Sequence, residues 1–291
     1  AHVVSDLLTL VSTNGRKRVK VLLAAVNAKY IHSNLAVYCL SGTLAFVSVA
    51  ENGERSFSFA RKPGADTKIE KEEINVDILD KTTLFHVGSL SLTEQPARNT
   101  THYAIRRAKE KGSIISYDPN YRASLWKDKK TAKEQMRSLI PYVDLMKISD
   151  EETELLTGKE KPEEAAKLLF EKGVKIVVVT LGSKGAYLYC KEGGLQIPGF
   201  VSKVADTNGA GDSFWGGFLY RISKSGKKPE EFTLNELKEY VRFGNAVASL
   251  CVEKKGAIPA MPTLMEVRER MGQLSSGKNL WLFRYCWFFR L

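Results

Sequence analysis

The stretch that most constrains the fold is residues 206–212, the glycine-rich run Asp-Thr-Asn-Gly-Ala-Gly-Asp, which leads directly into an apolar pattern. The apolar residues that follow recur at helical spacing: Phe214, Phe218, Leu219 and Ile222. A small-residue loop that opens a helix presents unpaired backbone N–H groups, and the helix dipole adds positive potential. Phosphate is the usual anion at such a turn. The run therefore predicts an anion-binding turn at a helix N-terminus.

Asp212 stands in the first turn of that predicted helix. A carboxylate beside bound phosphate can accept the proton of a hydroxyl that attacks the phosphate. Alternatively, Asp206 or Asp212 caps the helix, because acidic residues are common at helix starts. From the short Gly-Ala-Gly-Asp string alone, both interpretations stand.

The composition is that of an ordinary globular protein, with 291 residues, 43% of them hydrophobic and 26% charged. This length fits one α/β domain or two small ones. The four cysteines are far apart and form no Cys-x-x-Cys pair, which argues against a zinc site and favours a reducing, cytoplasmic location. Since no run of 18 apolar residues occurs, we expect no membrane span.

The net charge of +11 raises nucleic-acid binding as a possible function. Residues 1–42 carry +4 and residues 275–291 carry +3, which leaves +4 on residues 43–274. The body of the chain is therefore not a basic domain. We expect no nucleic-acid partner and no membrane partner, and mild positive charge suits an enzyme for anionic nucleotides.

Strand and helix patterns organise the central part of the chain. Two β-rich runs, residues 43–49 and 55–61, flank an Asn-Gly pair typical of a hairpin. Strand patterns then alternate with helical ones, with strands predicted at 83–90, 113–118, 143–149 and 175–181, and helices at 94–111, 163–172 and 234–251. This alternation predicts an α/β fold with an open, mostly parallel sheet covered by helices. Sites in such sheets lie at the carboxyl ends of the strands.

The two ends of the chain differ from this body. Residues 20–26 have the pattern of a short buried strand and 33–40 that of a helix start. Residues 20–36 look like the opening of cobalamin-binding radical enzymes, although so few residues cannot form such a domain, so we interpret them as a graft or a reading-frame accident. Residues 275–291 are aromatic and basic and are interpreted as an interfacial anchor or a loosely packed non-native end. We therefore divide the chain at 1–42, 43–274 and 275–291.

Three strings resemble the motifs of the ribokinase-like PfkB carbohydrate kinases. They are Asp-Thr-x-Gly-Ala-Gly-Asp at 206–212, Asp-Pro-Asn-x-Arg at 118–122 and Thr-Leu-Gly-Ser-x-Gly at 180–185, and residues 59–66 look like fructokinase-type members. The resemblance covers roughly residues 43–274. It implies a three-layer α/β/α fold with a small β lid, the hairpin at about 43–66. It also implies ATP-dependent phosphorylation of a sugar hydroxyl, with fructose favoured and ribose, 2-keto-3-deoxygluconate and nucleosides as substrates of relatives.

The same resemblance implies roles for individual residues. Asp212 would be the base, with the amides of Gly209, Ala210 and Gly211 as anion hole. Nucleotide contacts fall on Thr180, Gly182, Ser183, Gly185, Asn208 and Asn245. Sugar contacts fall on Arg61, Asn120 and Arg122. Mg²⁺ with ATP would be held near Glu152 and Asp206, and carbonyls of residues 253–259 would hold K⁺. Lids in this family often pair, which makes a homodimer through the lid possible.

Each assignment has a structural alternative. Arg61 and Arg122 also fit as solvated arginines, residues 182–185 as a plain hairpin turn, and Asn245 as a core-edge amide. Most acids at 150–154 need no function at a helix start. Ser149 stands where the family usually has Asn, with Glu152 in the Glu position. The sequence has no Walker-A string, which argues against a P-loop kinase.

Residues 1–42 lack the Gly-Gly-x-x-x-Asn helix start with which these kinases bind sugar hydroxyls. Two hypotheses of different class follow. The chain is a fructokinase-like enzyme that uses ATP and a small sugar, or it is a catalytically impaired nucleotide-binding remnant without a competent acceptor site.

Overall fold

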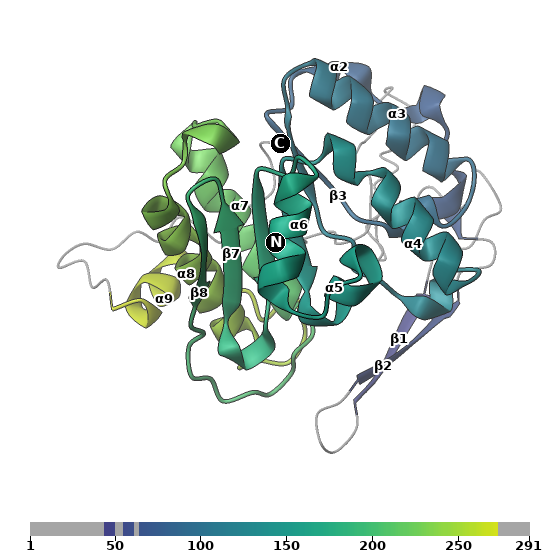
Figure 1. Cartoon of the computed structure of the whole chain (residues 1–291). Coiled ribbons are helices and arrows are strands. Elements are labelled where there is room, and N and C mark those ends of the chain that lie inside the picture. The colour runs from purple at the N-terminus through teal and green to yellow at the C-terminus, as the bar shows by residue number, and fades with distance from the viewer. Residues whose placement is uncertain (1–43, 50–54, 61–63, 273–291) are drawn as a thin grey trace.

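The structure, a computed structural model, describes residues 44–49, 55–60 and 64–272, with side chains from residue 64 onward. Within these ranges, β1 (Leu44–Val49) and β2 (Arg55–Ala60) form an antiparallel hairpin in which Leu44 pairs with Ala60. This hairpin projects away from the body of the molecule (Figure 1). At its base β2 contacts a short 3₁₀ helix, η4 (Ala123–Leu125). The hairpin predicted from the Asn-Gly pair is confirmed in its strands.

The body is built on one six-stranded sheet in which the strands follow chain order. The strands are β3 (Leu84–Val87), β4 (Ile114–Tyr117), β5 (Leu145–Ser149), β6 (Ile176–Thr180), β7 (Ala186–Cys190) and β8 (Gly193–Ile197). The first four are parallel, as the alternation of strands and helices predicted. The last two run antiparallel to their neighbours, which makes the sheet mixed at one edge.

Helices cover both faces of this sheet (Figure 1). One face carries α3 (Ala97–Glu110), α4 (Lys129–Ser138), α5 (Asp150–Thr157) and α6 (Pro162–Glu171), with α2 (Val76–Asp80) packed against α3. The other carries α7 (Ala210–Ser225) and α8 (Leu234–Cys251), with α9 (Leu264–Arg270) packed against α8. Further 3₁₀ turns are η1 (Ala65–Lys68), η2 (Lys71–Glu73), η3 (Leu90–Leu92), η5 (Ile140–Tyr142), η6 (Gly182–Lys184) and η7 (Pro229–Glu231). The three-layer α/β/α architecture is confirmed.

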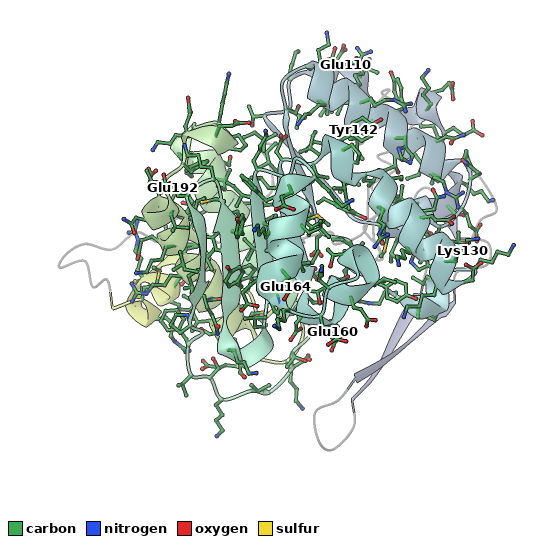
Figure 2. The ribbon with its side chains drawn as sticks, in the orientation of Figure 1. Glu110, Lys130, Tyr142, Glu160, Glu164 and Glu192 are labelled. Atoms are coloured by element: carbon green, nitrogen blue, oxygen red, sulfur yellow. The ribbon has the colours of Figure 1, made fainter. Side chains whose placement is uncertain are left out.

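Alternation along the strands separates two cores. Val177 and Val179 of β6 pack with α3–α6, whereas Ile176 and Val178 pack with α7 and α8. Successive strand side chains point to opposite faces, so a continuous apolar strand can serve both layers. Charged side chains such as Glu110, Lys130 and Glu164 lie on the outer surfaces of their helices (Figure 2).

Helix α8 illustrates how local sequence sets an element. Its N-cap Thr233 accepts a hydrogen bond from the Glu236 amide, and the Glu236 carboxylate accepts one from the Thr233 amide at 3.0 Å. This reciprocal capping box fixes where the helix begins. The helix spans 234–251, as the apolar spacing predicted.

Several sequence predictions fall outside the described residues. These are the strand and helix start predicted within 1–42, the tail at 275–291, and Arg61. Among the residues that the structure describes, no helix has the length and apolarity needed to cross a membrane.

Candidate active site

The polar motifs singled out from the sequence follow neighbouring strands of the sheet. Asp118 comes directly after β4, Ser149 ends β5 and Thr180 ends β6. Because these three strands are parallel and adjacent, their carboxyl ends lie along one edge of the sheet. The N-terminus of α7 meets the same edge, since Gly211 lies against a side chain of β5.

The turn at 206–212 is held by contacts that its own residues make. Gly209 has a φ of +76°, in the left-handed region, and a Cβ built on it would lie 2.7 Å from the Ala257 Cβ. Asp206 ties the same two segments together, because its Oδ1 accepts from the Asn208 amide and its Oδ2 from the Gly256 amide, each at 2.9 Å. The predicted anion-binding turn is therefore braced against residues 253–259.

The three amides predicted for the anion hole are not equivalent. The Ala210 N–H donates to the Thr207 carbonyl at 3.2 Å, a bond internal to the turn. For the Ala210 amide to bind an anion as predicted, its N–H must share its hydrogen bond between the Thr207 carbonyl and the anion, or exchange one for the other. Gly211 and Asp212, in the first turn of α7, are half-buried.

Lys147 is the functional candidate that the sequence reasoning missed. Its Nζ lies 2.6 Å from Asp118 Oδ2, and the two side chains are only 7% and 0% exposed. A Cβ built on Gly211 would lie 3.2 Å from the same Nζ, so the ammonium lies directly against the α7 turn. The available signal was a lysine within the mostly apolar strand at 145–149, preceded along the chain by an acid, Asp118, that directly follows the strand at 114–117.

Three carboxylates set the charge state of Lys147. Burial by itself lowers the pKa of its ammonium, but Asp118, Glu152 and Asp212 together raise that pKa above its ordinary value. Lys147 is therefore a cation at neutral pH, and the charges that surround it include the predicted base.

Glu152 joins two loops of the site. Its Oε1 accepts from the Tyr121 amide at 2.6 Å, and its Oε2 accepts from the Ser149 amide at 2.9 Å and hydroxyl at 3.1 Å. Ser149 is the N-cap of α5 in a capping box with Glu152, so serine replaces the family's usual asparagine without loss of the cap.

The carboxylates near the turn do not form a metal cage. Within the described ranges, no group of three or more His, Cys, Asp or Glu side chains is placed to hold a metal ion. Glu152 and Asp206 each accept hydrogen bonds from backbone amides with both oxygens, but a carboxylate oxygen has two acceptor sites. This arrangement fits a magnesium ion that is bound to phosphates and keeps its waters, since such an ion needs only one or two carboxylates.

The loop after β4 carries the predicted sugar contacts. Asn120 has a φ of +48°, a left-handed conformation that asparagine tolerates better than most residues. Arg122 Nη1 donates to the Tyr121 carbonyl at 3.0 Å, and both Asn120 and Arg122 are half-buried. The loop continues into η4, against which β2 lies, so these residues stand between the sheet edge and the hairpin.

The predicted nucleotide residues lie around the β6–β7 connection. Gly185 has a φ of +92°, and a Cβ there would lie 2.1 Å from the Ile197 carbonyl oxygen. Asn245 Nδ2 donates to the carbonyls of Ile197 and Pro198, at 3.3 and 3.0 Å. Both residues therefore hold the end of β8, and their contacts with a nucleotide stay predictions.

The other predicted nucleotide residues are more accessible. Ser183 in η6 is exposed, and Gly182 has a φ of +57° with nothing near its Cβ position. Thr180 is half-buried, and its hydroxyl makes a 3.4 Å contact with the Ile148 carbonyl.

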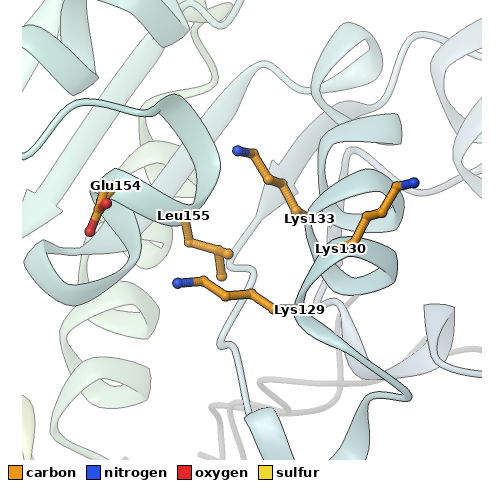
Figure 3. Close-up of a pocket in the computed structure, with 5 residues that line it drawn as sticks. All are labelled: Lys129, Lys130, Lys133, Glu154 and Leu155. Carbon is orange, nitrogen blue, oxygen red and sulfur yellow. The ribbon is translucent and has the colours of Figure 1, made fainter.

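A separate surface hollow of about 360 Å³ lies between α4 and α5 (Figure 3). It is lined by Lys129, Lys130, Lys133, Glu154 and Leu155, none of which belongs to the predicted site. In Figure 3 Lys129 extends toward Leu155, whereas Lys130 points away from it. Exposed lysines of this kind usually belong to a solvent-facing helix surface and keep their charged ends in water.

Comparisons with known proteins agree with this geometry. Residues 41–264 match the model of the pfkB family carbohydrate kinases. The chain is 40% identical to probable fructokinase-5 of Arabidopsis thaliana over 230 residues, 78% of this chain and 70% of that protein. It resembles a fructokinase from Xylella fastidiosa with bound ATP, with a TM-score of 0.73, 31% identity, and coverage of 79% and 73%.

A second solved structure shows what such a fold can hold. It is a fructokinase double mutant from Vibrio cholerae O395 in a fructose, ADP and potassium ion bound form. Its TM-score to this chain is 0.73 at 25% identity, covering 91% of this chain and 96% of that one.

The comparisons do not support the likeness of residues 20–36 to cobalamin-binding radical enzymes. The family match spans most of the chain and includes all three motifs, at 118–122, 180–185 and 206–212. With about 40% identity to a fructokinase over 230 residues, it establishes that this chain belongs to the pfkB family of carbohydrate kinases.

Proposed function

We propose that this chain is a fructokinase-like enzyme that transfers the γ-phosphoryl group of ATP to a hydroxyl of a small sugar, with fructose as the preferred acceptor. The observation that carries the proposal is the turn at 206–212. Its Asp212 stands in the first turn of α7, at the edge of the sheet where the strands end. The names of the relatives, fructokinases at about 40% identity, support the choice of sugar.

In the proposed reaction Asp212 is the general base. It accepts the proton of the acceptor hydroxyl while that oxygen bonds to the γ-phosphorus, and the bond to the β,γ-bridging oxygen breaks to release ADP. Positioned proton transfer of this kind contributes about 10²- to 10⁴-fold in rate. The amides of Gly209, Ala210 and Gly211, with the α7 dipole behind them, oppose the negative charge on the transferring group.

We further propose that Mg²⁺ accompanies ATP. When bound to the phosphates it neutralises part of their charge. Glu152 would hold it through a water, and Asp206 would act beside it, since a hydrated magnesium ion needs only one or two carboxylates. K⁺ would bind carbonyls of residues 253–259, which Asp206 positions through the Gly256 amide.

The remaining assignments divide between the two substrates. Asn120 and Arg122, with Arg61 from the lid, would bind the sugar. Residues around the β6–β7 connection, the turn before α7 and α8 would bind the nucleotide: Thr180, Gly182, Ser183, Gly185, Asn208 and Asn245. We also propose that two lids pair in a homodimer and that the protein is cytoplasmic.

The test is ADP release with Mg-ATP and K⁺ over a panel of fructose, ribose, 2-keto-3-deoxygluconate and adenosine. We expect turnover on fructose that falls by about 10²- to 10⁴-fold in Asp212→Asn. Asp77→Asn, an exposed acid in the first turn of α2, is the matched control and should keep full activity. No turnover by the unaltered chain, with ATP still bound in calorimetry, would instead favour a nucleotide-binding remnant.

A further inference from the structure

The buried pair of Lys147 and Asp118 calls for an explanation beyond stability. Both side chains are almost fully removed from water, and an ion pair in that position loses about as much solvation as it gains in attraction. Asp118 Oδ1 is buried and has no hydrogen-bond partner among the described residues. A well-packed apolar pair would serve stability at least as well. Stability alone therefore does not account for this buried pair.

The strand register shows which way the ammonium faces. Lys147 shares its side of β5 with Leu145, which packs in the core under α7 and α8. Its Nζ lies against Gly211, at 3.2 Å from the position of a Cβ there. The next residue along α7 is Asp212.

The start of α7 is also fixed in position against the sheet. Trp215 Nε1 donates to Ser116 Oγ at 2.9 Å, one turn after Asp212. Ser116 Oγ lies 3.0 Å from His86 Nδ1. Burial first, and the charge of Lys147 second, lower the pKa of His86 to about 3, so this histidine is neutral. The charged groups that interact electrostatically with Lys147 are Asp118 from the end of β4, Glu152 from α5 and Asp212 from α7.

We propose that Lys147 is a positioning residue for phosphoryl transfer: its ammonium, held by Asp118, supports the turn at Gly211 and keeps the Asp212 carboxylate charged and oriented. This inference rests on the proposed function, which makes Asp212 the base. Without the ammonium, Asp212 would lose a positive charge with which it interacts. Loss of a nearby opposite charge favours the protonated form of a carboxyl, and a protonated Asp212 cannot act as a base.

The experiment separates a positioning role from a structural one by using two variants. The control is Asp80→Asn with Arg107→Met, which removes an ion pair between α2 and α3, outside the candidate site, and should leave kcat within about 5-fold of the unaltered enzyme. The double variant Asp118→Asn with Lys147→Met removes the ammonium without leaving a buried carboxylate unpaired, so it should fold with a similar Tm. In that variant we expect kcat to fall by about 30-fold or more, with the acidic limb of its pH profile about one pH unit higher.

A second readout does not depend on activity. The titration of the Asp212 carboxyl carbon is followed by carbon-13 NMR, with its signal assigned by its loss in Asp212→Asn. We expect the midpoint to lie about one pH unit higher in Asp118→Asn with Lys147→Met than in Asp80→Asn with Arg107→Met. Equal midpoints in the two variants would overturn the proposal, whatever the activity. Failure of the proposed function would show separately, as absence of turnover by the unaltered chain on every sugar.

Discussion

Position 185, just before β7, requires glycine because a Cβ would not fit there. The residue has a φ of +92°, and a Cβ would lie 2.1 Å from the Ile197 carbonyl oxygen and 2.5 Å from the Gly199 nitrogen. Both neighbours are backbone atoms of the segment that Asn245 also holds, so neither can move alone. We predict that Gly185→Ala lowers the free energy of unfolding by about 3 kcal/mol or more, measured by urea denaturation.

Gly182, three residues earlier, is the matched control. Its φ of +57° lies in the left-handed region, but nothing lies within 4 Å of its Cβ position. Gly182→Ala should therefore cost only about 1 kcal/mol, the penalty for the backbone conformation. Equal losses in the two variants would show that the backbone angle alone, and not the close approach to β8, makes Gly185 necessary.

The positions of candidate site residues in the fold could be predicted from the sequence where a contiguous string carried them. Asp212 and Glu152 belong to such strings, and the structure places both at the end of the sheet where the strands were expected to converge. Lys147 was missed because its partner Asp118 is 29 residues away along the chain. Only the pairing of β4 with β5 brings them together, and a sequence does not state which strands pair.

Between elements, the crossing of α7 and α8 depends on two glycines. A Cβ on Gly244 would lie 2.8 Å from the Phe214 carbonyl oxygen, whereas a Cβ on Gly217 would lie 3.0 Å from a Val247 methyl. Alanine in a helix interior gains about 1 kcal/mol over glycine from helix propensity. A backbone clash outweighs that gain, so we predict that Gly244→Ala lowers the free energy of unfolding by about 1–3 kcal/mol.

Gly217→Ala is the comparison for that crossing, because the Val247 side chain can adjust while the α7 backbone cannot. Its effect in the same urea denaturation experiment should be smaller than that of Gly244→Ala. A larger loss for Gly217→Ala would mean that the packing of Val247, rather than the approach of the two backbones, limits the crossing.

The start of α8 gives a prediction on pH. A hydrogen bond from Lys227, and then those from Thr233, lower the pKa of the Glu236 carboxyl from 4.5 to about 2. Because this pKa is lower in the folded state, the contribution of Glu236 to stability is fully present above pH 4.5 and is lost as the pH falls toward 2. The Tm difference between the unaltered protein and Glu236→Gln should therefore be constant near neutrality and shrink below pH 4.5.

Glu239→Gln, an exposed position on the same helix, is the control for that measurement. A Tm difference for Glu236→Gln that stays constant down to pH 3 would contradict the prediction. It would mean that Glu236 acts through packing rather than through its charge.

Elements with a strong local signal were predicted, and those defined by their neighbours were not. Helix α8 has regular apolar spacing and a capping box, and its bounds were predicted at both ends. The strands β7 and β8 were not predicted. Gly193 and Gly194 begin β8, and glycine is unfavourable in a strand unless a neighbour supplies the pairing. Here that neighbour is β7, which itself depends on β6.

For the whole molecule, nucleotide binding should appear as stability. A ligand that binds only the folded state at 100 times its Kd adds about 2.7 kcal/mol to the free energy of unfolding. In a domain of this size about 1 kcal/mol corresponds to 2–4 °C in Tm. We therefore predict that ATP with Mg²⁺ at that concentration raises Tm by about 5–10 °C, measured by differential scanning calorimetry.

The same shift in Tm tests whether Asp212 acts on the acceptor hydroxyl without being needed for ATP binding. Asp212 is proposed to act on the acceptor hydroxyl, and its negative charge lies beside the place proposed for the phosphates. Removing that charge in Asp212→Asn should leave the ATP-induced shift at least as large, even though turnover is lost, because binding a polyanion is not helped by a carboxylate. If the shift disappears in this variant, the carboxylate supports the turn at 206–212 itself, and the loss of turnover no longer identifies Asp212 as the base.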